Sequence, residues 1–283
     1  MTQSIFTLPS TAQIEFRKVK LAEESLLSVA AKKKRSNIDA ALTEIMTRCA
    51  VSVKDPGPYP FMEVGGKPDW NLMAKGDRFA AMLDLRCLTY RDGHLYDVDL
   101  RCTNSLCGEK FNWEVDIPKD VLRINFPQES VDKLRSGGLF EVTIDGKVVK
   151  YNIAIGKTEE VYNRLCMQYP GRDMASALRA RIVEVEGLQP SQIMDWLDGE
   201  GGSEFEGLTS QDAEDLRDAF DRVDGGVDTT LEAECPACHS VIEFDLPFSG
   251  IFLPGKGISE RRRRLRREAM ARREESKTTA DSE

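Results

Sequence analysis

The chain has 283 residues, 41% of them hydrophobic, and is therefore long enough to bury one large core or two smaller ones. No apolar run approaches the roughly 20 residues of a membrane-spanning helix, so the sequence predicts no membrane span. The formal net charge of −9 disfavours general binding to nucleic acid, because neutralising phosphate groups requires a basic face.

The N-terminal part predicts an opening hairpin followed mainly by helices. Residues 1–8 are strand-like and lack the basic and apolar regions of a secretory signal, which predicts a reducing compartment. Ser36 and Asp39 form a capping box, which marks the start of a helix. The predicted elements, in chain order, are a hairpin over residues 4–8 and 13–19, helices over 21–33 and 36–49, a loop rich in Pro and Gly over 54–67, and a helix over 69–90.

Residues 96–118 and 227–247 share one pattern although they lie far apart in the chain. Each has an alternating strand, a close pair of cysteines, and a second alternating strand that ends in Asp, an aliphatic residue and Pro. Thiolates on tight turns can converge on one ion. The pattern therefore predicts a closed, tetrahedral zinc site of structural type with four ligands: Cys102, Cys107, Cys235 and Cys238.

Other interpretations of these cysteines remain open. They could be buried free thiols or form a disulfide, and Cys235-Pro-Ala-Cys238 also resembles a redox motif. The extended pattern after Cys238 disfavours redox chemistry, because a redox motif places its first cysteine at the start of a helix, where its pKa is lowered. The first pair departs from the usual metal-binding turn, since four residues rather than two separate its cysteines.

His239 and the three remaining cysteines are not expected to bind the metal. His239 directly follows a predicted ligand and is a candidate for supporting the site from outside the ligand set. The other three cysteines sit among apolar residues and are expected in the core: Cys49, Cys87 and Cys166.

The 127 residues between the two cysteine pairs are too many for a loop of a zinc ribbon and predict an inserted subdomain. Asp145-Gly146 between alternating strands predicts a hairpin over residues 139–154. Helical spacing occurs over residues 159–168, 174–186, 192–197 and 210–223. Thr209 or Ser210 is expected to cap the last helix. We expect this insert to be mainly helical and acidic, with a flexible joint over residues 199–207.

The C-terminal part carries two candidate partner-binding features. An apolar cluster after the second hairpin is expected to be buried in a groove between domains or against a partner: Phe248, Ile251, Phe252 and Leu253. Residues 260–275 hold eight Arg and four Glu, a local charge of +4, so the rest of the chain carries −13. The composition predicts a projecting helix. It is a solubilising tail, a docking helix for an acidic partner through Arg261 and Arg264 or, as a third alternative, a contact to nucleic acid. Residues 276–283 are expected to be disordered.

Several enzyme signatures are incomplete in this chain. Gly156-Lys157-Thr158 resembles the end of a phosphate-binding loop, but Tyr151 stands where that loop needs its first Gly. Residues 221–226 resemble only a fragment of a calcium loop. The two histidines leave few places for histidine acid–base catalysis. We therefore predict a protein that is not an enzyme and has no small-molecule substrate.

These features together predict an α+β fold, with a helical N-terminal part, a split zinc-ribbon-like pair of β-hairpins and an inserted, mainly helical subdomain. The expected domains are residues 1–118, with the N-terminal hairpin, the helices and the first zinc hairpin; 119–226, the inserted α+β subdomain; 227–257, the second zinc hairpin that completes the ribbon; and 258–283, the Arg-rich helical tail.

A series of motifs follows in order: FTLPS at the N-terminus, GDRFAAMLDLRCLTY, the first cysteine hairpin, and a late CPAC followed by FDLPFSGIF. This order resembles the phage family of T-even-type baseplate hub proteins and hub-assembly chaperones, over about residues 5–255. The most specific parts are Gly76-Asp77-Arg78-Phe79, Arg86 and Tyr90, with the two cysteine pairs. The Arg-rich C-terminal segment departs from the family pattern.

The resemblance implies a virion or assembly protein of contractile-tailed phages that acts through protein contacts without catalysis. It implies location at the tail baseplate after assembly in the host cytoplasm, with other baseplate and tail proteins as partners. A transient assembly chaperone, absent from the mature particle, is the alternative. A zinc-ribbon protein associated with nucleic acid is a third, which the acidic strands around the cysteines disfavour: Asp97, Asp99, Glu114, Asp116, Glu232, Glu234, Glu243 and Asp245.

Overall fold

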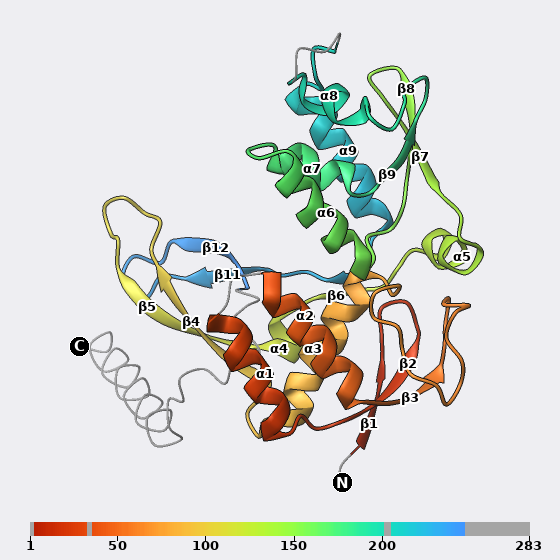
Figure 1. The fold of residues 1–283 in the computed structure, drawn as a ribbon. Helices are drawn as coiled ribbons and strands as arrows, with labels where there is room; N and C mark the ends of the chain where they lie inside the picture. Colours follow the sequence, from red (N-terminus) through yellow and green to blue (C-terminus); the bar gives the residue numbers. More distant parts are fainter. Residues whose placement is uncertain (1–2, 33–35, 201–204, 247–283) are drawn as a thin grey trace.

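The computed structural model describes residues 3–32, 36–200 and 205–246 (Figure 1). Helices alternate with small antiparallel sheets, which confirms the predicted α+β class. No helix within these ranges is long and apolar enough to cross a membrane. The residues expected to bind partners lie outside the described ranges: Phe248, Ile251, Phe252, Leu253, Arg261 and Arg264.

The N-terminal body is a three-stranded antiparallel sheet with helices packed against it, in the lower half of Figure 1. Its elements are β1 (Gln3–Thr7), β2 (Gln13–Arg17), α1 (Leu21–Lys32), α2 (Ser36–Cys49), β3 (Ala50–Asp55) and α3 (Lys75–Thr89). The predicted opening hairpin is confirmed, and α1 packs against α2. Leu42, Ile45 and Met46 form the buried face of α2, as its spacing predicts.

Two details of this body differ from prediction. Strand β3 was not predicted, because an alternating pattern of only six residues is too short to indicate a strand. Its pairing with β2 makes the segment a strand. The helix predicted over residues 69–90 begins only at Lys75. Asp69 instead accepts a hydrogen bond from the N–H of Asn71 at 3.0 Å, in a turn that precedes the helix.

The elements from β7 to α9 form a second lobe, at the top of Figure 1. They are β7 (Phe140–Ile144), β8 (Lys147–Tyr151), α6 (Gly156–Gln168), α7 (Asp173–Arg179), β9 (Ile182–Val185), α8 (Ile193–Asp198) and α9 (Ser210–Val223). Asp145 and Gly146 adopt φ of 49° and 71°, which confirms the predicted hairpin turn. Thr209 caps α9 by accepting a hydrogen bond from the N–H of Asp212 at 3.1 Å.

The helix predicted over residues 174–186 is wrong in its second half. Helix α7 ends at Arg179, and the chain then enters β9, where Val185 pairs with Val149 of β8. Ile182 and Val185 are buried in the lobe, so tertiary pairing overrides the local helical spacing. Short elements connect the lobe to the rest of the chain: α4 (Ile117–Asp120), β6 (Arg123–Ile124), α5 (Gln128–Ser136) and β10 (Gly226–Val227), with β6 and β10 paired.

Backbone contacts join the second lobe to the N-terminal body at a junction beside the start of α3. The N–H of Lys75 donates to the carbonyl of Ala154 at 2.7 Å, and the N–H of Gly156 donates to the carbonyl of Met73 at 3.0 Å. A Cβ placed on Gly76 would lie 1.8 Å from the carbonyl oxygen of Gly225, so only glycine allows the two backbones to approach so closely here.

Charged residues of α3 also form hydrogen bonds with other segments of the N-terminal body. Asp77 is fully buried and accepts hydrogen bonds from the N–H of Ser10 at 2.9 Å, from the Ser10 hydroxyl, and from the Tyr59 hydroxyl at 2.7 Å. Arg78 donates to Thr43 Oγ1 of α2 at 2.7 Å. The motif that carried the family resemblance therefore holds the N-terminal body together from inside.

The end of α3 makes equivalent ties to the chain around it. Arg86 donates to the carbonyl of Leu95 at 3.1 Å, and its guanidinium lies over the rings of Tyr90 and Tyr96. The Tyr90 hydroxyl donates to Glu24 Oε1 of α1 at 2.7 Å. Arg86 and Tyr90 thereby connect α3 with α1 and with the strand that leads to the first cysteine pair.

Among the residues that the structure describes, clustered buried apolar side chains form two separate groups. A large core runs through both the N-terminal body and the second lobe, and includes the bases of the two cysteine hairpins through Val98, Val115, Leu231 and Leu246. A second group consists of only three buried residues around the cysteines: Cys102, Cys235 and Ile242. Such a small group cannot supply much hydrophobic stabilisation by itself.

Candidate metal centre

Two hairpins carry the four cysteines, and both extend to the left of the body in Figure 1. One hairpin pairs β4 (Leu95–Arg101) with β5 (Lys110–Asp116), and the other pairs β11 (Thr230–Glu234) with β12 (Val241–Asp245). These strands match the sequence prediction. Alternation along β11 buries Leu231 and Ala233 on one face and leaves Glu232 on the other.

The two hairpin turns have the same backbone geometry. In each, the N–H of the first cysteine donates to the carbonyl two residues past the second cysteine, at 2.8 Å in the first hairpin and 3.0 Å in the second. The residue after the second cysteine is left-handed in both, with φ of 60° at Gly108 and 59° at His239. The similarity of the two sequence segments therefore extends to their backbone.

Backbone bonds also account for the wider spacing of the first pair. Gly108 donates its N–H to the carbonyl of Asn104 at 3.1 Å, and His239 donates to the carbonyl of Cys235 at 2.9 Å. Asn104 thus takes the turn position that Cys235 takes in the second hairpin, and Cys102 lies two residues before it.

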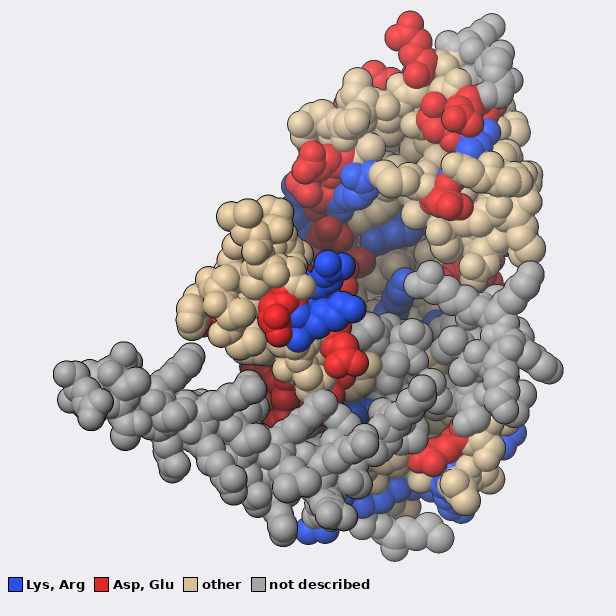
Figure 2. Space-filling view, turned by 90° about the vertical axis from the view of Figure 1, so that its left-hand side faces the viewer, with Lys and Arg blue, Asp and Glu red and all other residues tan. Residues whose placement is uncertain are grey.

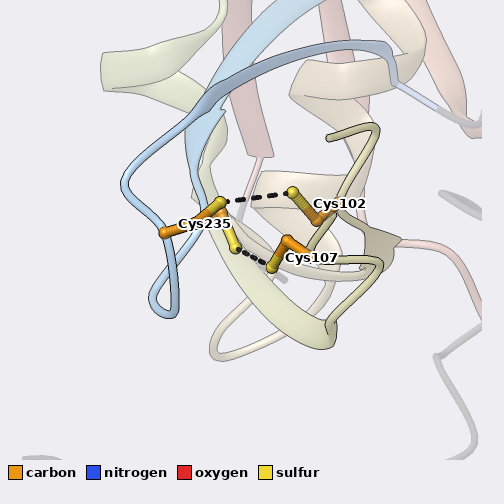
Figure 3. A group of neighbouring side chains, drawn as sticks. Cys102, Cys107 and Cys235 are labelled. Atoms are coloured by element: carbon orange, nitrogen blue, oxygen red, sulfur yellow. Dashed lines mark hydrogen bonds between the residues drawn. The ribbon is translucent and has the colours of Figure 1, made fainter. Parts of the chain in front are cut away.

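The four sulfur atoms converge between the turns. Cys102 Sγ lies 3.6 Å from Cys238 Sγ, Cys107 Sγ lies 3.8 Å from Cys235 Sγ, and all four lie within 4.8 Å of one another. Figure 3 shows Cys102 and Cys107 facing Cys235 across the gap between the hairpins. A tetrahedral ion with bonds of about 2.3 Å to sulfur requires sulfur atoms about 3.8 Å apart. The cluster fits such an ion.

A disulfide does not fit this arrangement. Both close sulfur pairs are far longer than the S–S bond of about 2.05 Å, and all seven cysteines are free. Of the three cysteines predicted in the core, Cys49 is fully buried, whereas Cys87 and Cys166 are half-buried. They lie on other elements and take no part in the cluster.

The thiols of the cluster have perturbed pKa values. Burial raises the pKa of Cys102 to about 12. The hydroxyl and backbone N–H of Ser240 lower the pKa of Cys238 to about 6. A divalent cation attracts the negative charge that burial penalises, and would hold all four sulfurs as thiolates.

Two polar side chains, Asn104 and Ser240, contact the cluster from outside the ligand set, and neither was predicted from the sequence. Asn104 Nδ2 donates to Ser240 Oγ at 3.3 Å and lies 3.9 Å from Cys238 Sγ, while Ser240 Oγ lies 3.3 Å from the same sulfur. The available signal was their position within two residues of a cysteine. His239, the predicted candidate, is 67% exposed and places Nδ1 2.5 Å from Glu234 Oε1.

Acidic side chains face each other in pairs along the strands that lead to the cysteines. Asp97 lies directly across β4–β5 from Glu114, and Glu232 lies directly across β11–β12 from Glu243. Like charges that face each other across a ladder destabilise it. An external basic group that contacted these strands would relieve the repulsion.

Two basic residues also flank the cysteines, at the ends of their strands. Arg101 and Lys110 are exposed and directly opposite each other. Figure 2 looks from the side of the hairpins and shows Lys and Arg interspersed with Asp and Glu, without a broad basic area among the described residues of that face. This pattern gives little support to binding of nucleic acid.

One comparison with known proteins gives a match. The family model described as T4 bacteriophage base plate protein matches residues 1–251. This span contains the N-terminal body, the junction, the second lobe and all four clustered cysteines. No curated protein and no solved structure matches the chain.

Proposed function

Since the chain belongs to the T4 bacteriophage base plate protein family, we propose that it is a structural component of the hub region of a contractile-tail baseplate. It acts there through contacts with other baseplate and tail proteins and not through catalysis. The family match over residues 1–251 carries this proposal. The family match supports a location at the virion tail, and the hub position is the finer part of the proposal.

The cysteine cluster is assigned as a structural zinc site. Four thiolate ligands within 4.8 Å of one another are typical of structural zinc, because four protein ligands complete its tetrahedral coordination and leave no position for a substrate. When bound, zinc would neutralise the thiolates and cross-link Cys102 and Cys107 of one hairpin to Cys235 and Cys238 of the other. A protein that must keep one geometry in a large assembly benefits from this rigidity.

A structural metal could serve to fix the N-terminal helical part relative to the insert. The junction between them already has backbone hydrogen bonds and the close contact of Gly76 with Gly225. The cluster lies at the other ends of the hairpins, so the metal instead fixes the hairpins to each other. Their outward acidic faces then form a rigid surface for basic partners.

The proposal is tested by counting copies of the chain in purified phage particles and in the crude infected lysate. Quantitative mass spectrometry would scale each amount to a tail-tube protein. We expect a fixed, low copy number in particles. Abundance in the lysate combined with absence from particles would instead make the protein a transient assembly chaperone.

A further inference from the structure

An apolar pocket of about 490 Å³ lies at the junction between the N-terminal body and the second lobe. Segments from both parts line it, including the start of α3 and the turn after α9, which meet at the waist of the molecule in Figure 1. Its main apolar walls are Phe79, Phe126, Ile153, Val227 and Leu246.

The charged groups at the pocket already have partners. Lys75 Nζ lies 3.3 Å from Glu159 Oε2, and Asp224 accepts two hydrogen bonds from Arg181 at 2.7 and 2.8 Å. Because both charges are paired within the protein, the pocket offers no unpaired charge to an ionic ligand. An apolar side chain is the occupant that fits these walls.

The chain itself brings apolar side chains to this place. Leu246 is the last described residue, lines the pocket, and is held by its N–H bond to the carbonyl of Thr229 at 2.8 Å. Phe248 follows two residues later, so its Cα lies within roughly 7 Å of that of Leu246. Ile251 and Phe252 follow three and four residues after Phe248.

We propose that Phe248 of the same chain fills this pocket, with Ile251 or Phe252 beside it, so that residues 247–253 strap the two parts together. An apolar cavity of about 150 Å³ accommodates one benzene ring, so this pocket has room for a phenyl ring and a second apolar side chain.

Photo-cross-linking of the full-length chain tests the strap directly. The photoreactive residue p-benzoylphenylalanine replaces Phe248, and unlabelled protein is mixed with nitrogen-15-labelled protein before irradiation, so that cross-links within and between chains differ in mass. We expect cross-links within one chain to the peptides that contain Phe79, Phe126 or Val227. The same probe at Leu106, which is 96% exposed at the turn of the first hairpin, is the control and should give none of them.

Two outcomes would overturn the proposal. Cross-links to these peptides only between chains would assign the pocket to a second copy, and cross-links at other sites alone would leave it to a different partner. A second measurement guards against disturbance by the probe. Phe248→Ala should accelerate hydrogen exchange at Gly225–Thr229, while Phe248→Leu should largely preserve protection; equal exchange in both variants and the wild type would also contradict the strap. Neither result depends on where in the phage the protein resides.

Discussion

Asp77 connects the start of α3 to two other segments of the N-terminal body, through Ser10 and Tyr59. Its carboxylate is completely buried, and three hydrogen bonds from Ser10 and Tyr59 compensate for the loss of water. Burial nevertheless raises its pKa to about 6, although the bonds from Ser10 and Tyr59 oppose that rise. The sequence marked Asp77 only by family resemblance, because its partners lie 67 and 18 residues away.

We predict that Asp77 makes the protein more resistant to unfolding as the pH falls from about 6 to about 4. In that range the folded state keeps a proton that the unfolded chain, with a pKa near 3.8, has released. The gain is at most about 3 kcal/mol in free energy of unfolding, and the contribution is flat above about pH 6. Urea unfolding of the wild type and of Asp77→Asn, from pH 4 to pH 8, measures it.

In that experiment the wild type should gain stability relative to Asp77→Asn only in the acidic part of the range. The exposed Asp99→Asn serves as the matched control and should show no such trend. A difference between wild type and Asp77→Asn that stays constant at every pH would show that the buried carboxyl does not titrate as described.

At the scale of elements, the sequence predicted those features that a few neighbouring residues determine, such as turns and helix caps. The Asp145-Gly146 turn and the Thr209 cap are confirmed, and the two cysteine pairs meet in one cluster. Strands β3 and β9 were missed because pairing with β2 and β8 creates them. The supporting roles of Asn104 and Ser240 depend on the meeting of two hairpins, which no local pattern encodes.

The contact between α3 and the turn after α9 gives a second prediction. Gly76→Ala would place a Cβ 1.8 Å from the carbonyl oxygen of Gly225, and neither backbone can move without disturbing the junction. We expect a loss of at least about 2 kcal/mol in free energy of unfolding, which lowers Tm by roughly 5 °C. Calorimetry measures the change.

Gly138→Ala is the control for that experiment. A Cβ at Gly138 meets only atoms of the Lys133 and Ser136 side chains, at 3.3 Å or more, and these can move aside. If both substitutions change Tm equally, the close approach at Gly76 does not contribute specifically to stability.

At the scale of the whole molecule, the two separate apolar groups imply two levels of stability. The large core extends through the body, the second lobe and the bases of the hairpins, whereas three buried residues serve the region around the cysteines. We therefore expect that small region to depend on a bound metal ion for its stability, and the rest of the molecule to be stable without it.

Removal of the metal with a chelator should accordingly loosen the hairpin ends and leave the main fold intact. We expect faster hydrogen exchange over residues 99–112 and 232–243, with little change in the N-terminal body or in the far-ultraviolet circular dichroism. Cooperative unfolding of the whole chain on chelation would contradict the division into two cores.

The most direct test of the account is the zinc content of the purified chain, measured by native mass spectrometry and elemental analysis. Wild-type protein and Cys166→Ser, which changes a half-buried cysteine outside the cluster, should each carry one zinc ion per chain. Cys235→Ser should lose the ion and show a lower Tm. A wild-type protein without bound zinc after expression in zinc-supplemented medium, or a Cys235→Ser variant with unchanged zinc and Tm, would contradict the central claim that zinc joins the two hairpins.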